Sequence, residues 1–199
     1  MADMKVSEFP PTTLGQLLNW NDHHQFELID GVTYRSGKHA SHPYTDVVGA
    51  IRAQIDAASS DAGWVPIPEG ALIRLGKVEQ DDADVMTMVR PDAALACEPA
   101  RLDSMGLRGA PDWIAEVVTR SSAILDHIIK RHVYERVGTA EYWLVDPYQK
   151  LLTVYQLGNT GYEKPRIHEL AGKTELSLLP GVFIDWDAVP MEEPGAVMD

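Results

Sequence analysis

Trp113-Ile114-Ala115-Glu116-Val117-Val118 is the stretch of sequence that decides the fold. It is a nearly continuous apolar run of strand length, which is typical of a strand covered on both faces of a sheet in an α/β protein. One acidic residue interrupts the run, and charged side chains are seldom buried unless they are paired or bind a metal. Glu116 therefore indicates either a structural ion pair with an arginine or a metal site.

The residues that follow predict a helix and then a second buried strand. Ser121 or Ser122 can cap the helix, and Gly138 is expected to end it, because a left-handed glycine commonly follows the last helical turn. Its apolar residues are Ile124, Ile128 and Val133. The apolar run from Tyr142 to Val145 then predicts a strand directly after the helix.

Polar residues on this helix share one face. Asp126, Lys130 and Tyr134 follow one another at steps of four, so Lys130 can point toward Glu116. Near a metal-bound water, a lysine cation could orient or help to deprotonate the nucleophile and stabilise charge on a phosphate. The alternative is an ordinary pair between Asp126 and Lys130 on the solvent face of the helix.

A second acidic residue begins the strand expected before this stretch. Pro91-Asp92 stands at the start of the run from Arg90 to Cys97, where strand propensity disfavours an aspartate. If the two strands are neighbours, the carboxylates of Asp92 and Glu116 can converge on a hard divalent cation. Oxygen ligands of this kind suit Mg²⁺ or Mn²⁺.

The rest of the chain predicts further strands and a second main helix. Asp30-Gly31 lies between two runs of β-forming residues, which indicates a hairpin over 26–34 with Glu27 on its first strand. Apolar residues at helical spacing from Val47 to Ile55 predict a helix that ends near Ser60. Other strands are expected over 64–75, 90–97, 151–157, 162–170 and 182–186, the last three extending the sheet at the C-terminal end.

Length and composition predict a single domain over residues 10–189 and a loose acidic tail over 190–199. No apolar run is long enough to cross a membrane, and the first ten residues lack the pattern of a signal peptide, so we expect a cytoplasmic protein. The single cysteine, Cys97, excludes an intramolecular disulfide and a thiolate metal cluster. Any metal would need oxygen or imidazole ligands.

The charge balance opposes nucleic-acid binding. The chain has 17 Lys and Arg residues against 30 Asp and Glu residues, a net charge of −13 that repels phosphate. Binding depends on local patches, however, and the middle of the chain is basic, with Arg101, Arg108, Arg120, Lys130, Arg131 and Arg136. The acidic stretches 79–84 and 191–199 are expected to be a solvated loop and a tail.

Several separated motifs occur in a recognisable order. They are Phe26-Glu27-Leu28-Ile29-Asp30-Gly31, Arg90-Pro91-Asp92, Pro111-Asp112, Glu116-Val117-Val118-Thr119, Asp126, Lys130, Tyr134, Gly138 and Glu141-Tyr142-Trp143-Leu144-Val145-Asp146-Pro147. With these motifs the chain resembles the Uma-two family of predicted restriction endonucleases, a branch of the PD-(D/E)XK nuclease superfamily. An ordered set of motifs over about two thirds of a chain is far more specific than one short pattern.

The resemblance implies a restriction-endonuclease-like mixed β-sheet flanked by helices, with extra C-terminal strands. It implies Asp92 and Glu116 as ligands of Mg²⁺ or Mn²⁺ and Lys130 as the catalytic lysine. In the wider superfamily this lysine lies two residues after the acid, where the chain has Val118, whereas the Uma-two family carries it at the position of Lys130. Glu27 matches a glutamate of the family and would be a further ligand or a water-orienting acid, unless it forms a hairpin ion pair.

The expected function is that of a magnesium-dependent endonuclease that hydrolyses DNA, plausibly as a homodimer by analogy with nucleases that cut both strands. The net charge motivates an alternative, a catalytically inactive binding or regulatory protein that retains the nuclease fold. A third possibility is another phosphate-bearing substrate, because a fold alone does not fix a function. His42 lies near a histidine of the family, and we expect it to be a loop residue.

Overall fold

The computed structural model describes residues 12–21, 23–36, 42–59, 63–77 and 79–191. Its central layer is a mixed seven-stranded sheet in the order β12-β11-β10-β9-β6-β3, with β13 also paired to β11. The strands are β3 (Val65–Pro66), β6 (Ala93–Ala96), β9 (Trp113–Val117), β10 (Glu141–Asp146), β11 (Leu151–Gly158), β12 (Gly161–Tyr162) and β13 (Arg166–Glu169). Only β9 and β10 run parallel in this sheet. The expected α/β fold with a mixed sheet and added C-terminal strands is confirmed, but the strand expected over 182–186 does not extend this sheet and pairs instead in a separate hairpin over 173–185.

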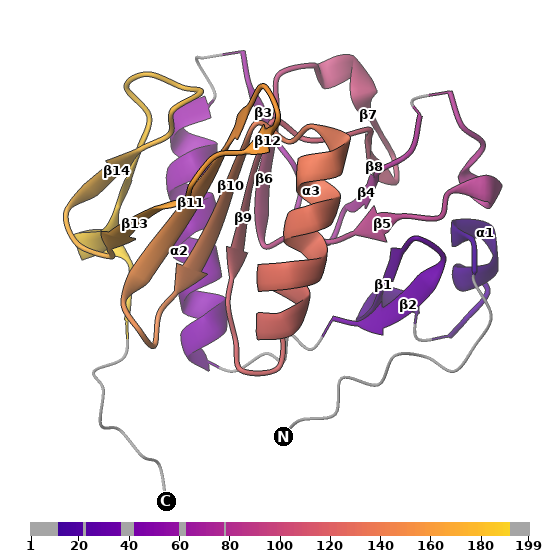
Figure 1. The fold of residues 1–199 in the computed structure, drawn as a ribbon, viewed down its shortest axis with the longest axis horizontal. Helices are drawn as coiled ribbons and strands as arrows, with labels where there is room; N and C mark the ends of the chain where they lie inside the picture. Colours follow the sequence, from indigo (N-terminus) through magenta and orange to yellow (C-terminus); the bar gives the residue numbers. More distant parts are fainter. Residues whose placement is uncertain (1–11, 22, 37–41, 60–62, 78, 192–199) are drawn as a thin grey trace, which may run out of the picture.

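Helices cover both faces of this sheet (Figure 1). On one face α2 (His42–Ser59) packs on Ala115 and Val117 of β9. On the other face lie the π-helical segment η4 (Leu125–Lys130) and α3 (Arg131–Val137), whose Tyr134 packs with Ile114 of the same strand. Because successive side chains of a strand point to opposite faces, β9 is buried from both sides, as its apolar sequence predicts.

A second, six-stranded sheet follows the order β2-β1-β5-β4-β8-β7. Its strands are β1 (Phe26–Ile29), β2 (Val32–Arg35), β4 (Leu72–Arg74), β5 (Met88–Val89), β7 (Leu102–Asp103) and β8 (Gly106–Arg108). The predicted hairpin is confirmed as β1 and β2, and its turn residues Asp30 and Gly31 have φ values of 51° and 80°, as a two-residue hairpin turn requires. Glu27 thereby stands on β1.

The remaining elements are short. They are α1 (Leu14–Leu17), the 3-10 turns η1 (His23–Gln25), η2 (Asp82–Asp84), η3 (Pro99–Arg101) and η5 (Trp186–Ala188), and the hairpin of β14 (Lys173–Glu175) and β15 (Phe183–Asp185). Cys97 directly follows β6, is exposed, and donates its backbone N–H to Asp112 at 2.8 Å. None of the helices in the described ranges combines the length and the hydropathy of a membrane span.

Two expected strands are shorter than their sequence suggests. Residues 64–75 form β3 and β4, which belong to different sheets, since Pro66 and Pro68 lack a backbone donor and Gly70 turns the chain with φ of 73°. Residues 162–170 are likewise divided between β12 and β13, with Pro165 in the gap. Most of the tail expected over 190–199 lies outside the described residues.

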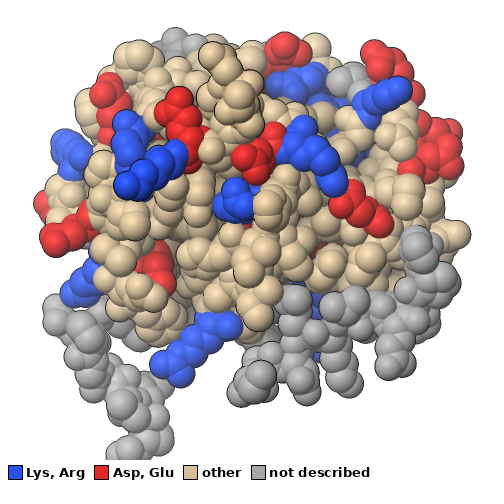
Figure 2. Space-filling view, viewed as in Figure 1, with Lys and Arg blue, Asp and Glu red and all other residues tan. Residues whose placement is uncertain are grey.

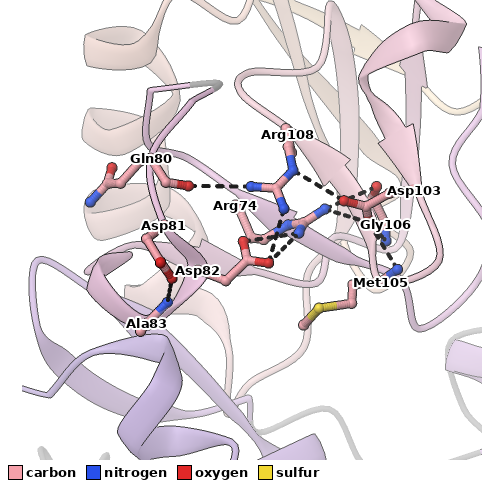
Figure 3. Close-up of polar contacts among 9 residues, drawn as sticks. All are labelled: Arg74, Gln80, Asp81, Asp82, Ala83, Asp103, Met105, Gly106 and Arg108. Atoms are coloured by element: carbon pink, nitrogen blue, oxygen red, sulfur yellow. Dashed lines mark hydrogen bonds and ion pairs between the residues drawn. The ribbon is translucent and has the colours of Figure 1, made fainter.

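The acidic stretch 79–84 is held by two arginines, Arg74 and Arg108 (Figure 3). Asp82 accepts hydrogen bonds from Arg74 Nη1 at 3.0 Å and from Arg108 Nη2 at 3.0 Å. Asp103 closes the network, with its Oδ1 2.7 Å from Arg74 Nη2 and its Oδ2 3.1 Å from Arg108 Nε. The expectation of a merely solvated loop is therefore wrong for Asp82, which joins η2 to β4 and β8.

Candidate active site

A buried lysine connects three acidic side chains. The Lys130 ammonium lies 2.9 Å from Glu116 Oε1, 2.9 Å from Glu27 Oε2 and 3.5 Å from Asp126 Oδ1. Lys130 itself is 0% exposed, so the alternative of an ion pair on the solvent face of the helix is wrong. The structural ion pair considered for Glu116 exists, but its partner is this lysine and not an arginine.

The carboxylates of this cluster have further fixed partners. Glu116 Oε1 also accepts the hydroxyl of Tyr134 at 2.9 Å. Glu27 Oε1 accepts the backbone N–H of Arg90 at 2.7 Å, which ties β1 to the segment that leads into Asp92. The structure therefore brings Glu27, Glu116 and Lys130 together, from a hairpin, a central strand and a helix.

The helix that carries Lys130 is not a regular α-helix. Residues Leu125–Lys130 form a π-helical turn that continues into α3. Such turns are rare and often occur at functional sites. Asp126, Lys130 and Tyr134 all face inward and are buried, whereas Ile124 and Ile128 are 57% and 54% exposed. The predicted polar face is thus the buried one.

The cluster is strongly coupled electrostatically. Burial alone would lower the pKa of Lys130, but the charges of Glu116, Glu27 and Asp126 raise this pKa well above its usual value. Burial and the neighbouring Glu116 carboxylate raise the pKa of Tyr134 as well. In this arrangement Lys130 is an ammonium and Tyr134 a neutral hydrogen-bond donor.

Asp92 directly precedes β6, the strand that pairs with β9 and its Glu116. The pairing of β6 with β9 sets Ala93 opposite Ala115, so the next position places Asp92 across from Glu116. The expectation of neighbouring strands is confirmed. The Asp92 carboxylate accepts hydrogen bonds from the Tyr44 hydroxyl through Oδ1 and from the Val117 N–H through Oδ2, the latter at 2.7 Å. These contacts direct it toward α2, whereas Glu116 engages the helix on the opposite face.

The sequence analysis missed the residues that hold Asp92. Tyr44 donates to its side chain, and Arg52 Nη1 donates to its backbone carbonyl at 2.5 Å. Tyr44, Val48 and Arg52 recur at steps of four on α2, and this spacing was the signal that could have found them. The described structure places His42 at the first position of α2.

A metal would have to be held by few protein ligands. Within the described ranges, no group of three or more His, Cys, Asp or Glu side chains is placed to hold one. Mg²⁺ does not require such a group, because it usually keeps several waters and binds one or two carboxylates together with substrate phosphates. Asp92 and Glu116 are hard carboxylate donors of the kind that suits Mg²⁺ or Mn²⁺, but in this structure Asp92 is bonded to Tyr44 of α2 and Glu116 to Lys130 and Tyr134 of the helix on the other face.

Comparisons with known proteins agree with this architecture. The sequence model of the Uma2 family, described as "Putative restriction endonuclease", matches residues 13–187. Among solved structures, one match is a "putative nuclease belonging to DUF820" from Anabaena variabilis ATCC 29413, with a TM-score of 0.69 and 15% sequence identity over 90% of this chain and 97% of the other. No curated protein matches the chain. The structural match shows a shared fold.

Proposed function

Because the chain belongs to the Uma2 family, we propose that it is a metal-dependent endonuclease that hydrolyses DNA phosphodiester bonds. One observation carries the proposal. Lys130 is wholly buried between Glu27 and Glu116, and Glu116 lies across from Asp92, which directly precedes the adjacent strand. Two acids and a lysine brought together from separate elements are what phosphodiester hydrolysis with a hard cation needs.

Asp92 and Glu116 would hold the metal in this proposal. When bound, Mg²⁺ or Mn²⁺ would supply positive charge that polarises the scissile phosphate and favours ionisation of water. The hydrogen bonds from Tyr44 and Val117 fix the Asp92 carboxylate before any ligand arrives. Such preorganisation lowers the cost of assembling the site.

Lys130 contributes a fixed cation. Its ammonium holds the carboxylates of Glu27 and Glu116 in place and adds positive charge beside them. In a buried environment this charge acts on a nearby phosphate more strongly than it would in water. Glu27 orients Lys130 from the hairpin side, and its bond to the Arg90 N–H links this hairpin to Asp92.

Metal binding is the first property to test, because a cleavage assay can fail through the wrong substrate. We expect Mg²⁺ or Mn²⁺ to raise the thermal unfolding temperature of the wild type but not that of an Asp92→Asn, Glu116→Gln double variant. At a metal concentration of 100 times Kd, the stabilisation is about 2.7 kcal/mol. Asp112→Asn is the matched control, since Asp112 lies near the opposite end of the same strand pair and binds Arg101.

The second test is a cleavage assay with a DNA substrate that the wild type cuts. Asp92→Asn keeps an acceptor for Tyr44 and should fold, yet its rate should fall by at least about 100-fold, as expected when a metal ligand is lost. Asp112→Asn should cleave like the wild type. An unchanged rate in Asp92→Asn would remove Asp92 from the site.

A non-catalytic binding or regulatory protein is the second candidate. The net charge of −13 favours it, and on the face shown in Figure 2 basic side chains lie among acidic ones and form no continuous basic stripe. Such a protein would show neither metal-dependent stabilisation nor DNA affinity that falls with salt at physiological ionic strength. Another phosphate-bearing substrate would retain the metal response without DNA cleavage.

A further inference from the structure

A pocket of about 250 Å³ opens beside Asp92. It lies between the first turns of α2, the end of β2 and the segment that leads into β6, and it is lined by His24, Tyr44, Gly49, Arg52, Arg90 and Asp92, among others. None of these named residues contacts Lys130 through its side chain, and among them Asp92 is shared with the proposed metal site. The pocket is therefore a separate feature that adjoins the proposed metal site.

Two arginines in the wall of this pocket, Arg52 and Arg90, form no side-chain ion pair within the described ranges, although burial lowers the pKa of Arg90 and the nearby Glu27 carboxylate partly opposes this shift. Arg52 donates to the carbonyl oxygens of Asp92 and Ile67 at 2.5 and 2.7 Å, and Arg90 donates to that of Phe26 at 2.6 Å. Carbonyl oxygens accept hydrogen bonds but do not neutralise a charge. Within the described ranges neither arginine forms an ion pair, whereas Arg74, Arg101, Arg108, Arg131 and Arg136 each have a carboxylate partner.

Partly buried cations without a counterion are costly, and an anionic ligand would remove this cost. Each guanidinium carries five N–H donors, so Arg52 and Arg90 retain donors beyond those used on the carbonyls. Arginine donors are suited to the paired oxygens of a phosphate. Glu69 also lines the pocket, but it is exposed and forms no ion pair with either arginine in the described part of the chain.

Gly49 adds an independent observation. It lies inside α2, where glycine costs about 0.5–1 kcal/mol relative to alanine, and no described atom lies within 4 Å of the position where a Cβ would stand. Packing within the described protein therefore does not require a glycine here. A glycine at the pocket wall leaves room for a ligand to approach the helix backbone closely.

We propose that this pocket binds a backbone phosphate of the nucleic acid next to the bond that is cut, with Arg52 and Arg90 as its ligands. This inference rests on the proposed function, because it takes Asp92 as the neighbouring metal ligand. It assigns substrate binding to a place where the chain, despite its net charge of −13, sets two arginines that form no side-chain ion pair within the described ranges in one pocket wall.

The test measures binding in the presence of EDTA, so that neither metal nor cleavage is required. Two probes are used, inorganic phosphate and a short DNA duplex. Gly49→Glu adds a carboxylate at the pocket wall, where a Cβ meets no described atom within 4 Å, and it introduces a better helix former. We expect it to weaken duplex binding by about tenfold or more, as the loss of a charge-assisted phosphate contact would.

Ala57→Glu is the matched control for Gly49→Glu. It adds the same charge to an exposed position of α2 that is eight residues, or about 12 Å, further along the helix. Arg52→Gln and Arg90→Gln should each also reduce the slope of log K against log salt concentration by about 1, whereas Arg101→Gln, outside the pocket, should not. If the arginine variants fail to fold, the comparison of duplex binding by Gly49→Glu and Ala57→Glu tests the pocket without them.

The outcomes separate this inference from the nuclease proposal. Selective loss of duplex binding in Gly49→Glu supports the pocket, whether or not DNA is cleaved when metal is added. Equal binding by Gly49→Glu and Ala57→Glu overturns the pocket and leaves metal-dependent cleavage standing. Binding of inorganic phosphate without the duplex, or of neither probe, also overturns it. Loss of cleavage in Asp92→Asn bears on the nuclease proposal alone.

Discussion

Replacement of Lys130 by methionine would leave the carboxylates of Glu27 and Glu116 buried without their cation. Removing one partner of a buried ion pair typically costs about 3–5 kcal/mol, because the remaining charge is left uncompensated. We expect Lys130→Met to lose this much free energy of unfolding at neutral pH in urea titrations. Arg131→Met is the control, since its partly exposed pair with Glu135 should contribute at most about 0.5 kcal/mol.

The stability of Lys130→Met should also depend on pH in a definite direction. Without the cation, the two glutamates carry buried charges that nothing neutralises, and uptake of a proton removes that cost in the folded state. The variant should recover stability as the pH falls toward about 5 and lose it as the pH rises again. A deficit that stays constant over this range would contradict a buried charge as its cause.

The site was predictable from the sequence only in part. Glu116 and Lys130 stand out because an acid in an apolar strand and a lysine at helical spacing need a common explanation, and the structure pairs them. The contact of Glu27 with Lys130 joins residues more than a hundred positions apart, so no local spacing could establish it. Arg52 was missed because its neighbours are backbone carbonyls, which leave no mark in a sequence pattern.

For the helices and strands, the sequence predicts which elements form, and whether each is a helix or a strand, better than it predicts their first and last residues. α2 and the strand pair β9 and β10 follow directly from apolar periodicity. The helix after β9 was predicted, but two of its three apolar positions, Ile124 and Ile128, turned out to be exposed. The π-helical turn places Lys130 against carboxylates from other elements, and these contacts fix the buried face of the helix.

The stability contributed by the ion-pair network that joins η2 to β4 and β8 should fall at acid pH. A hydrogen bond from Arg74 lowers the pKa of Asp103 to about 2 from its ordinary value of 3.8. The stabilisation is fully present above the ordinary value and is lost as the pH falls through the folded one. Since Asp103 is partly exposed, it amounts to about 1 kcal/mol after solvent screening.

This dependence can be measured by comparing the wild type with Asp103→Asn. Their free energies of unfolding should differ by about 1 kcal/mol near pH 5. The difference should begin to shrink below about pH 4 and vanish as the pH falls through about 2. Asp56→Asn, at an exposed position of α2, serves as the control for the general effect of removing one acidic charge. A gap that remains undiminished at about pH 2 would assign the loss to packing and not to ionisation.

For the molecule as a whole, cleavage of both strands of a duplex leads us to expect a homodimer. A two-fold symmetric pair would present one site to each strand of the DNA, in keeping with the symmetry of the duplex. Sedimentation equilibrium should then give twice the 22.0 kDa of one chain, at least in the presence of duplex DNA. A single-chain mass at all concentrations with and without DNA would instead indicate a nicking enzyme or a binding protein.

The position of Cys97 allows the binding of DNA to be observed directly with a label on the protein. It is the single cysteine of the chain, it is exposed, and it follows β6 at the end opposite Asp92, a separation of about 17 Å along the strand. A maleimide fluorophore or nitroxide spin label can therefore be attached to the natural sequence at one known point. Desolvation and the neighbouring Asp112 carboxylate raise the pKa of the thiol, so conjugation calls for mildly alkaline buffer. Energy transfer to a dye on the DNA would then report the orientation of the bound duplex without engineered cysteines.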